Sequence, residues 1–350
     1  MLKIFKLFIF DWKGWLLCGV TVLILFLSLE LLVRLEFPDT AYHQKRLDRY
    51  GWSVAPFATQ TMQIMDNDTY ARNVYIRYFE HGFKRWGDLQ TSKKKLLILG
   101  DSDTQMIQVS NGEEYYSYLA KAFDNVELFV YGNGNFGTLQ ELMVLEDYID
   151  IINPDMILWQ FCRNDYRNNS YALDKKPYGL GFVLNRCRPY LEEGRIVYRV
   201  QREFAVFRKY FKVIDFMLGR YNRWLYNKAF VDINIKNRLV KKHYKGLDTK
   251  KELEKSLEIT IELFRMVRQR AGEVPIYFFS ATEFGDKEKR ICDEAGLTGI
   301  PGIYKSLHSL SEAGTVVRVV NDPHWNRLGN NVVGNILVDY FRKHNLFGGI

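Results

Sequence analysis

The segment that decides the fold reads KKLLILGDSDT, at residues 94–104. Its first seven residues form a short and mainly apolar run, which is typical of a strand buried on both faces. Gly100 ends the run, and Asp101 and Ser102 follow where a strand would turn into a helix. Such a turn places a side chain beside helical N–H groups. We therefore expect a parallel sheet with chemically active residues at the end of this strand.

The same alternation of apolar run and helical stretch recurs along the chain. Strands are also predicted at VELFVYG (126–132), DMILWQF (155–161), VPIYFFSA (274–281) and TVVRVVN (315–321), and helices near 113–123, 138–151, 253–271 and 328–344. Strands that alternate with helices favour a parallel sheet covered on both faces. Functional sites in such sheets form at the carboxyl ends of the strands.

Polar residues follow three of the predicted strands. Ser102 follows the first, Asn164 follows the third, and Asp322 and His324 follow the fifth. A serine beside helical N–H groups is a candidate nucleophile, because those groups favour a developing negative charge. A histidine with an aspartate two residues earlier is a candidate general base, since the carboxylate fixes its tautomer. Asn164 supplies a neutral N–H donor for an oxyanion.

Each of these residues also has a structural interpretation. Ser102 could cap a helix, Asn164 could form a turn, and His324 could be a hydrogen-bonded surface residue. We predict that Asp101 and Asp165 are structural and hold their loops through backbone N–H groups. Because three polar clusters from distant parts of the sequence are expected at one sheet edge, we favour a catalytic site.

In order and separation, these motifs resemble those of the SGNH/GDSL hydrolase superfamily, over about residues 96–337 without an insert. ILGDSDT resembles the block that carries the nucleophile, here Ser102. CRND resembles the oxyanion block, with Asn164 as donor, and DPHWNRLG resembles the block that carries Asp322 and His324. The resemblance implies a three-layer α/β/α domain of flavodoxin-like character, which hydrolyses esters through an acyl-serine.

The chain departs from the family pattern at two points. In GNGNFGT (132–138), the usual oxyanion glycine aligns on Asn135, next to Gly134, and both residues are candidate oxyanion donors. Since that glycine acts through its backbone N–H, an asparagine can replace it where its φ is tolerated. The spacing Asp-x-His is closer to the Asp-x-His-Trp form of relatives that handle O-acetyl groups on bacterial exopolysaccharides. The resemblance therefore implies an acylated cell-surface carbohydrate as substrate.

Three other functions fit parts of this pattern. An O-acyltransferase of an exopolysaccharide would use the same triad, and a non-catalytic glycan-binding module would keep only the fold. DSDT is also similar to the aspartyl-phosphate motif of haloacid-dehalogenase-like phosphatases, but its Thr is one place early and Gly100 separates the strand from Asp101. The complete set of Ser102, Asn164, Asp322 and His324 favours the ester hydrolase.

The N-terminal region predicts a membrane span. Residues 14–29 carry no charge, and continuing past Glu30 to residue 33 gives 20 residues, or about 30 Å of helix. Glu30 is expected to reach headgroups and water at the far interface. Lysines at positions 3, 6 and 13 favour a cytoplasmic N-terminus and an exported body. Since no A-x-A-like site follows, an uncleaved anchor in the plasma (inner) membrane is favoured over a cleaved signal peptide.

The net charge of +8 is concentrated in one segment. Residues 195–251 contain 16 Lys and Arg against four acidic residues, so the rest of the chain is mildly acidic. Apolar residues three and four apart, from Phe204 to Leu225, predict a helix with one apolar side. We favour a cap helix packed over the hydrolase core; the alternative is a face that meets anionic lipid headgroups or an anionic glycan. Nucleic acid is not expected as a partner, because no recognised nucleic-acid motif accompanies the charge.

The predicted organisation has three parts. A cytoplasmic tail and anchor occupy residues 1–36, a membrane-proximal lead-in occupies 37–92, and the hydrolase domain occupies 93–350 with a basic helical insert at about 190–252. The four cysteines form no CxxC pair, and the six histidines have no metal-ligand spacing. We therefore predict chemistry by side chains alone, without a metal or cofactor.

Overall fold

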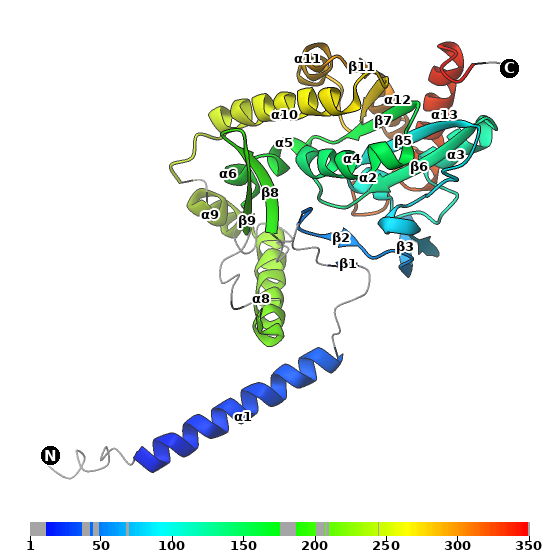
Figure 1. Cartoon of the computed structure of the whole chain (residues 1–350). Coiled ribbons are helices and arrows are strands. Elements are labelled where there is room, and N and C mark those ends of the chain that lie inside the picture. Colours follow the sequence, from blue (N-terminus) through cyan, green and yellow to red (C-terminus); the bar gives the residue numbers. More distant parts are fainter. Residues whose placement is uncertain are drawn as a thin grey trace, which may run out of the picture. The chain divides into compact units, whose positions relative to one another are not determined.

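The computed structural model describes residues 12–36, 43–44, 49–67, 70–175, 187–200, 207, 210–243 and 245–348. These residues form two compact units. The smaller unit contains the helices α1 (Trp12–Glu36), α8 (Lys212–Val231) and α9 (Ile233–His243). The larger unit contains all the described strands and the remaining described helices (Figure 1).

The larger unit is built on a parallel sheet of five strands in the order β11-β10-β7-β5-β6. The strands are β5 (Lys94–Gly100), β6 (Val126–Gly132), β7 (Met156–Phe161), β10 (Ile276–Ser280) and β11 (Thr298–Gly299). From β5 the chain moves to the sheet edge at β6 and then returns across β5 to β7. The carboxyl end of β5 is therefore a topological switch point, where open α/β sheets place their sites.

Helices cover both faces of this sheet. On β5, Leu97 and Leu99 pack into one apolar cluster, whereas Leu96 and Ile98 pack into a second one on the opposite face. The first cluster includes residues of α4 (Thr138–Ile152), α10 (Thr249–Ala271) and α11 (Asp286–Ala295), and the second includes residues of α3 (Tyr115–Ala122), α12 (Ile303–Glu312) and α13 (Arg327–Lys343). The predicted α/β/α architecture is confirmed, as are the long helices between its strands.

Shorter elements complete the larger unit. They are β1 (His43–Gln44), β2 (Ser53–Val54), the hairpin β3 (Thr59–Asn67) and β4 (Tyr70–Arg77), the 3-10 turn η2 (Glu80–Gly82), α2 (Ser102–Gln105), α5 (Asn164–Asn168), α6 (Tyr171–Asp174), β8 (Cys187–Glu192) and β9 (Arg195–Val200). The insert was expected to be helical in its first half, but its first residues form β9, which pairs antiparallel with β8. The β-branched and aromatic residues of RIVYRV suit this hairpin. Phe204, where the predicted helical spacing begins, lies outside the described residues.

One predicted strand is wrong. Residues 315–321 do not join the sheet, whose fifth strand is β11. Instead this segment folds back on its own continuation, with Arg318 opposite Trp325 in an isolated antiparallel bridge. Val319 N–H donates to the carbonyl of His324 at 3.1 Å. Val317 packs into the second cluster and Val319 is also buried. These apolar side chains therefore leave water although the segment has no place in the sheet.

In the smaller unit, α1 has 25 residues and a mean hydropathy of 2.6 over its most apolar window, so it is long and apolar enough to cross a membrane. A signal sequence would meet the same criteria. Glu30 was expected to reach headgroups and water, but it is buried and accepts the backbone N–H groups of Lys212 and Val213, each at 2.8 Å. Its carboxylate therefore caps the start of α8, where N–H groups lack helical partners.

Candidate active site

Ser102 opens α2 immediately after β5, and the residue before it holds the turn. Asp101 is fully buried, and its Oδ1 accepts the backbone N–H of Asp103 at 3.1 Å. The Asp101 N–H donates to Gln160 Oε1 at 3.1 Å, which also ties the turn to β7. Asp101 is thus structural, as predicted. A buried capping aspartate does not suit the phosphatase alternative, whose nucleophile must meet its substrate.

Asp322 and His324 form a close pair. Nδ1 of His324 contacts Asp322 Oδ1, and the backbone N–H of His324 donates to the same oxygen at 2.9 Å. Gln108 Nε2 donates to Asp322 Oδ2 at 3.2 Å and lies 3.0 Å from His324 Nδ1. Since Gln108 belongs to the segment after α2, it links this pair to the chain that carries Ser102.

The charges around His324 favour its protonated form. Burial by itself would lower the pKa of His324, but the hydrogen bond to Asp322 and the charges of Asp103, Asp322 and Asp101 raise it to about 9. For Asp322, burial raises the pKa, while the hydrogen bond and charge of His324 outweigh burial and lower the pKa to about 2. Asp101 and Asp103 flank Ser102 in the sequence. Both carboxylates contribute to the raised pKa of His324.

Ser102 and His324 are not hydrogen-bonded to each other in the described part of the chain. The Ser102 hydroxyl instead lies 3.5 Å from Asp101 Oδ2, which is the limit of a hydrogen bond. Hydrogen bonds between a nucleophile and its base are often long without substrate and tighten when substrate binds. Ser102 thus follows the carboxyl end of β5, whereas Asp322 and His324 follow residues 315–321, which do not join the sheet, and Gln108 links the two parts.

The loop after β6 passes beside the nucleophile. A Cβ on Gly132 would lie 2.2 Å from the backbone nitrogen of Gln105, so this position excludes side chains. A Cβ on Gly134 would lie 4.0 Å from Ser102 Cβ, which places the loop next to the serine. Gly134 N–H donates to Gln105 Oε1 at 2.8 Å. That N–H, predicted as an oxyanion donor, is thus already engaged.

Asn135 adopts the left-handed backbone conformation that a glycine would adopt easily at this position of the motif. Its φ is +61°, in the left-handed region that asparagine visits more readily than most residues. Within the described residues, the backbone N–H groups of Ser102 and Asn135 donate to no protein acceptor. These two groups are therefore open to an incoming oxyanion.

Asn164 begins α5, directly beyond β7, and reaches the nucleophile turn. Its Nδ2 donates to Asp101 Oδ2 at 3.0 Å. An amide nitrogen carries two N–H donors, so one remains for a ligand. The neighbouring Asp165 is buried and accepts the N–H of Cys162 at 2.9 Å, which confirms its predicted structural role. The structure thus brings Ser102, Gly134, Asn135 and Asn164 together from three strand ends.

Arg188 on β8 is a residue that the sequence analysis missed. Its guanidinium donates to the carbonyl of Asn135 at 2.6 Å and to Gln140 Oε1 at 2.5 Å, and its Nε lies 2.9 Å from Asp174 Oδ2. The side chain is buried. Arg188 therefore holds the Asn135 loop from outside the motifs. In the sequence it is one of many basic residues beside the insert, and no signal distinguishes it.

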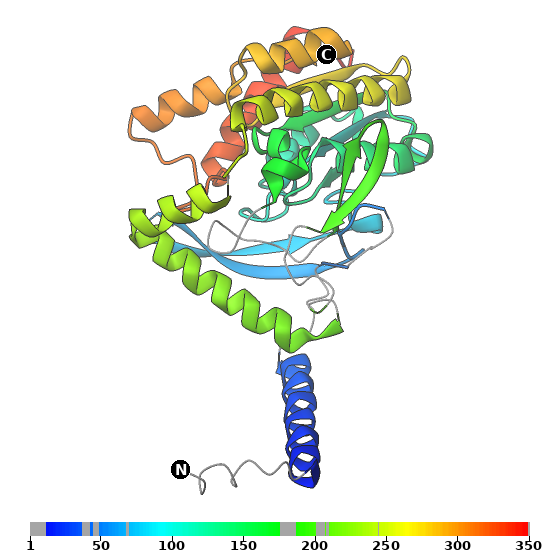
Figure 2. The ribbon, with the colours of Figure 1, turned by 90° about the vertical axis from the view of Figure 1, so that its left-hand side faces the viewer.

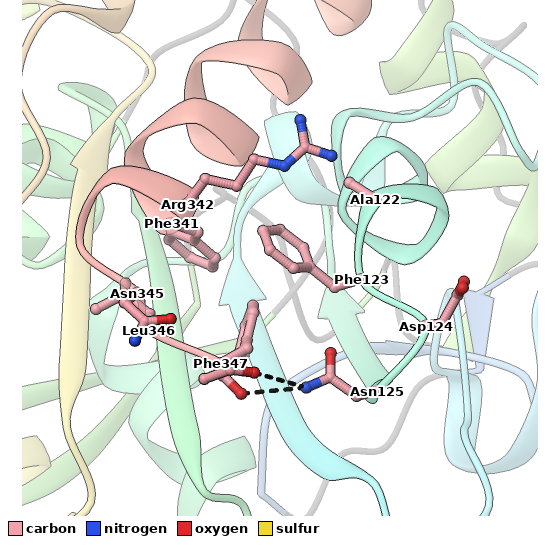
Figure 3. Close-up of a pocket in the computed structure, with 10 residues that line it drawn as sticks. Ala122, Phe123, Asp124, Asn125, Phe341, Arg342, Asn345, Leu346 and Phe347 are labelled. Carbon is pink, nitrogen blue, oxygen red and sulfur yellow. Dashed lines mark hydrogen bonds between the residues drawn. The ribbon is translucent and has the colours of Figure 1, made fainter. Parts of the chain in front are cut away.

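A separate cavity of about 410 Å³ lies at the other end of the sheet. Figure 3 shows the rings of Phe123, Phe341 and Phe347 converging there, with Asn125 Nδ2 donating to the carbonyl of Phe347 at 3.1 Å. Asn125 directly precedes β6, whereas the candidate site follows the carboxyl end of that strand. None of the predicted site residues lines this cavity.

Comparison with known proteins finds distant structural similarity. No family model matches the chain, and no curated protein matches it. Similar solved structures include a member of the lipolytic G-D-S-L family from Veillonella parvula (11% identity, TM-score 0.40), which covers 71% of this chain and 99% of that one. The psychrotrophic esterase EstA from Pseudoalteromonas sp. is 9% identical with a TM-score of 0.38, over 72% and 99%. The acetylxylan esterase Axe2 from Geobacillus stearothermophilus is 10% identical with a TM-score of 0.38, over 73% and 95%.

Proposed function

We propose that this chain is a serine ester hydrolase of the SGNH/GDSL type, which acts through an acyl-serine. The observation that carries the proposal is the pairing of Asp322 with His324, which Gln108 links to the segment after α2, the helix that Ser102 opens. Three residues in this arrangement can generate and stabilise a nucleophile. The motif order, which resembles that of the superfamily, supports the same assignment.

In the first step, His324 acts as general base. Its Nδ1 faces Asp322, so Nε2 is the nitrogen that accepts the Ser102 proton. The Ser102 oxygen attacks the ester carbonyl, and the carbonyl oxygen becomes an oxyanion. Asp322 stabilises the imidazolium and keeps its ring oriented. When the tetrahedral intermediate collapses, the imidazolium protonates the leaving alcohol and the acyl group stays on Ser102.

The oxyanion is stabilised by donors from three loops. The backbone N–H groups of Ser102 and Asn135 and the second N–H of Asn164 Nδ2 fill this role. Since Gly134 N–H is engaged by Gln105, its contribution is to bring the loop close to the serine. Fixed donors in a dry site stabilise a developing charge without reorganisation, and each is worth on the order of 10² to 10³ in turnover.

In the second step, water hydrolyses the acyl-serine. His324, neutral again after it has protonated the alcohol, removes a proton from water. The water oxygen attacks the acyl carbonyl, the bond to the Ser102 oxygen breaks, and the imidazolium returns its proton to that oxygen. A carboxylic acid is released and Ser102 is restored. An O-acyltransferase would replace this water by a sugar hydroxyl, through the same triad.

The proposed substrate is an O-acyl group, such as acetyl, on a cell-surface carbohydrate. The support is the Asp-x-His-Trp sequence at residues 322–325, which is similar to that of relatives acting on acetylated exopolysaccharides. Trp325 is fully buried and holds the catalytic segment to the core. Its role in this chain is therefore to position His324 rather than to contact the sugar.

We further propose that α1 is an uncleaved anchor in the plasma (inner) membrane and that the larger unit is exported. Its length and hydropathy support the span, and the lysines before it support the orientation. Carbonate extraction of membranes and protease protection in sealed spheroplasts test both points. Release of the full chain by carbonate, or a larger unit that protease reaches only after lysis, would contradict the anchor or its orientation.

Hydrolysis of p-nitrophenyl acetate by the full chain in detergent tests the activity. We expect turnover in the wild type and in the control Ser309→Ala, whose serine is exposed on α12. Ser102→Ala should show no turnover, because it cannot form the acyl-serine. A fluorophosphonate probe should label Ser102, and His324→Gln should suppress the labelling. Labelling of a different residue, or full turnover in Ser102→Ala, would refute the assignment.

Single-turnover experiments then separate hydrolysis from transfer. An activated acetyl ester is mixed with enzyme in the absence and presence of candidate polysaccharide, and the acyl group is followed by mass spectrometry. Prompt release of acetate without polysaccharide supports the hydrolase. A long-lived acyl-Ser102 that discharges only when polysaccharide is added would identify a transferase instead.

A further inference from the structure

One face of α8 carries an exposed stripe of large apolar and aromatic side chains. Met217, Tyr221 and Trp224 recur at helical spacing and are 62%, 50% and 55% exposed. The rings of Tyr221 and Trp224 stack with centroids 5.9 Å apart. We refer to these three residues as the α8 stripe. An exposed apolar stripe of this kind marks an interaction surface.

Cationic side chains flank the α8 stripe. Arg220, Arg223 and Lys228 are exposed on the same helix, and the Lys228 ammonium lies 6.0 Å from the centre of the Trp224 ring. From Lys212 to His243 the chain contains eight Lys and Arg and only two acidic residues. Aromatic rings beside long basic side chains suit the boundary of an anionic bilayer, where the rings enter the headgroup region and the charges meet phosphate.

The start of α8 is held to the end of α1. Glu30 caps α8, Arg34 donates to the carbonyl of Tyr210 at 3.1 Å, and the rings of Phe26 and Phe211 meet edge to face at 5.4 Å. Figure 2 shows α8 starting beside the C-terminal end of α1. The apolar part of α1 ends near Glu30. If α1 crosses a bilayer, α8 therefore begins at the level of the lipid headgroups.

We propose that the α8 stripe docks on the anionic headgroups of the bilayer that α1 crosses. Two observations support this partner over a soluble one. The cations match anionic lipid, and the junction with α1 places the helix next to a lipid surface. The inference rests on the proposed anchor but not on the esterase activity. Failure of the anchor would be seen separately, because carbonate would then extract the chain.

Quenching of Trp224 by brominated lipid tests the proposal. The full chain is placed in nanodiscs of phosphatidylcholine, with or without phosphatidylglycerol, and the Trp224 signal is obtained by subtracting the emission of Trp224→Phe. We expect brominated lipid to reduce this signal by roughly half in anionic discs, and by much less in neutral discs or at high salt. An unchanged Trp224 signal in brominated anionic discs would overturn the proposal.

Charge reversal provides the matched comparison. The triple variant Arg220→Glu, Arg223→Glu and Lys228→Glu should lose most of the quenching. A control with the same charge change, Lys289→Glu, Lys305→Glu and Lys343→Glu, alters exposed residues on helices of the larger unit and should keep it. Quenching that persists in the first variant would overturn the proposal. Trp224 emission that responds to soluble dextran sulfate but not to brominated anionic lipid would assign the stripe to an anionic glycan instead.

Discussion

The guanidinium of Arg188 on β8 donates a hydrogen bond to the backbone carbonyl of Asn135, at 2.6 Å and across 53 residues of sequence. Asn135 is the residue whose N–H we propose as an oxyanion donor, and its left-handed φ of +61° must be maintained for that N–H to face the site. The same guanidinium is fixed by Asp174 and Gln140. A buried arginine outside the motifs therefore sets the geometry of a loop inside them.

Arg188→Lys should lower kcat by about tenfold to a hundredfold while KM changes little. Lysine keeps the charge beside Asp174 but loses the planar fork that reaches Asn135 and Gln140 together. Steady-state kinetics with p-nitrophenyl acetate measures the split. Arg199→Lys is the matched control, because Arg199 pairs across the hairpin with Arg188 and forms a surface ion pair with Glu192. Equal effects of the two variants would show that Arg188 has no positioning role.

Asn164→Ala should reduce kcat on the order of 10²- to 10³-fold, because one oxyanion donor is lost while the nucleophile remains. Fluorophosphonate labelling of Ser102 should persist at a reduced rate, in contrast to Ser102→Ala. Thermal unfolding of both variants should stay near that of the wild type. If Asn164→Ala unfolds much earlier and retains its turnover when folded, Asn164 serves only to hold Asp101.

The specificity constant kcat/KM should rise with pH through the neutral range and level off above pH 9. The general base must be neutral, and the pKa of His324 is raised to about 9, so we expect the fraction of free enzyme with a neutral base to increase up to this pH. Asp103 contributes to that rise through its charge. Asp103→Asn should therefore shift the rising limb to lower pH and increase kcat/KM several-fold at neutral pH.

Asp124→Asn is the control for that measurement, since Asp124 is exposed and lines the cavity at the opposite end of the sheet. Its pH profile should match that of the wild type. An Asp103→Asn profile that also overlies the wild type would show that the charge of Asp103 does not act on the catalytic base.

Glu114→Gln should destabilise the larger unit by about 3–5 kcal/mol, because it leaves the Lys84 ammonium without a counter-charge. Both side chains are buried, with Nζ 3.5 Å from the carboxylate, and burial lowers the pKa of Lys84. The double variant Lys84→Met and Glu114→Gln should recover most of the loss, since no buried charge remains. Chemical unfolding followed by near-ultraviolet circular dichroism compares them. A double variant less stable than Glu114→Gln alone would contradict this account.

The sequence by itself determined four of the five strands of the sheet, β5, β6, β7 and β10. Apolar runs such as residues 94–100 are too short for a helix, and turn residues bound them, so they form buried strands. Parallel strands bring their carboxyl ends to one edge, which is why Ser102 and Asn164 could be predicted to lie together. The long apolar helix α1 was equally evident, because its length and hydropathy are local properties of the chain.

Only the tertiary structure decided which partners these residues have. Residues 315–321 have the composition of a strand, but they fold back on residues 324–326, which buries Val317 and Val319. That choice depends on space in the core. Glu30 caps the start of α8, a helix far along the chain, by accepting the Lys212 N–H. Arg188 and Gln108 reach Asn135 and Asp322 across long separations. Such contacts follow from packing between distant segments, and local sequence patterns do not encode them.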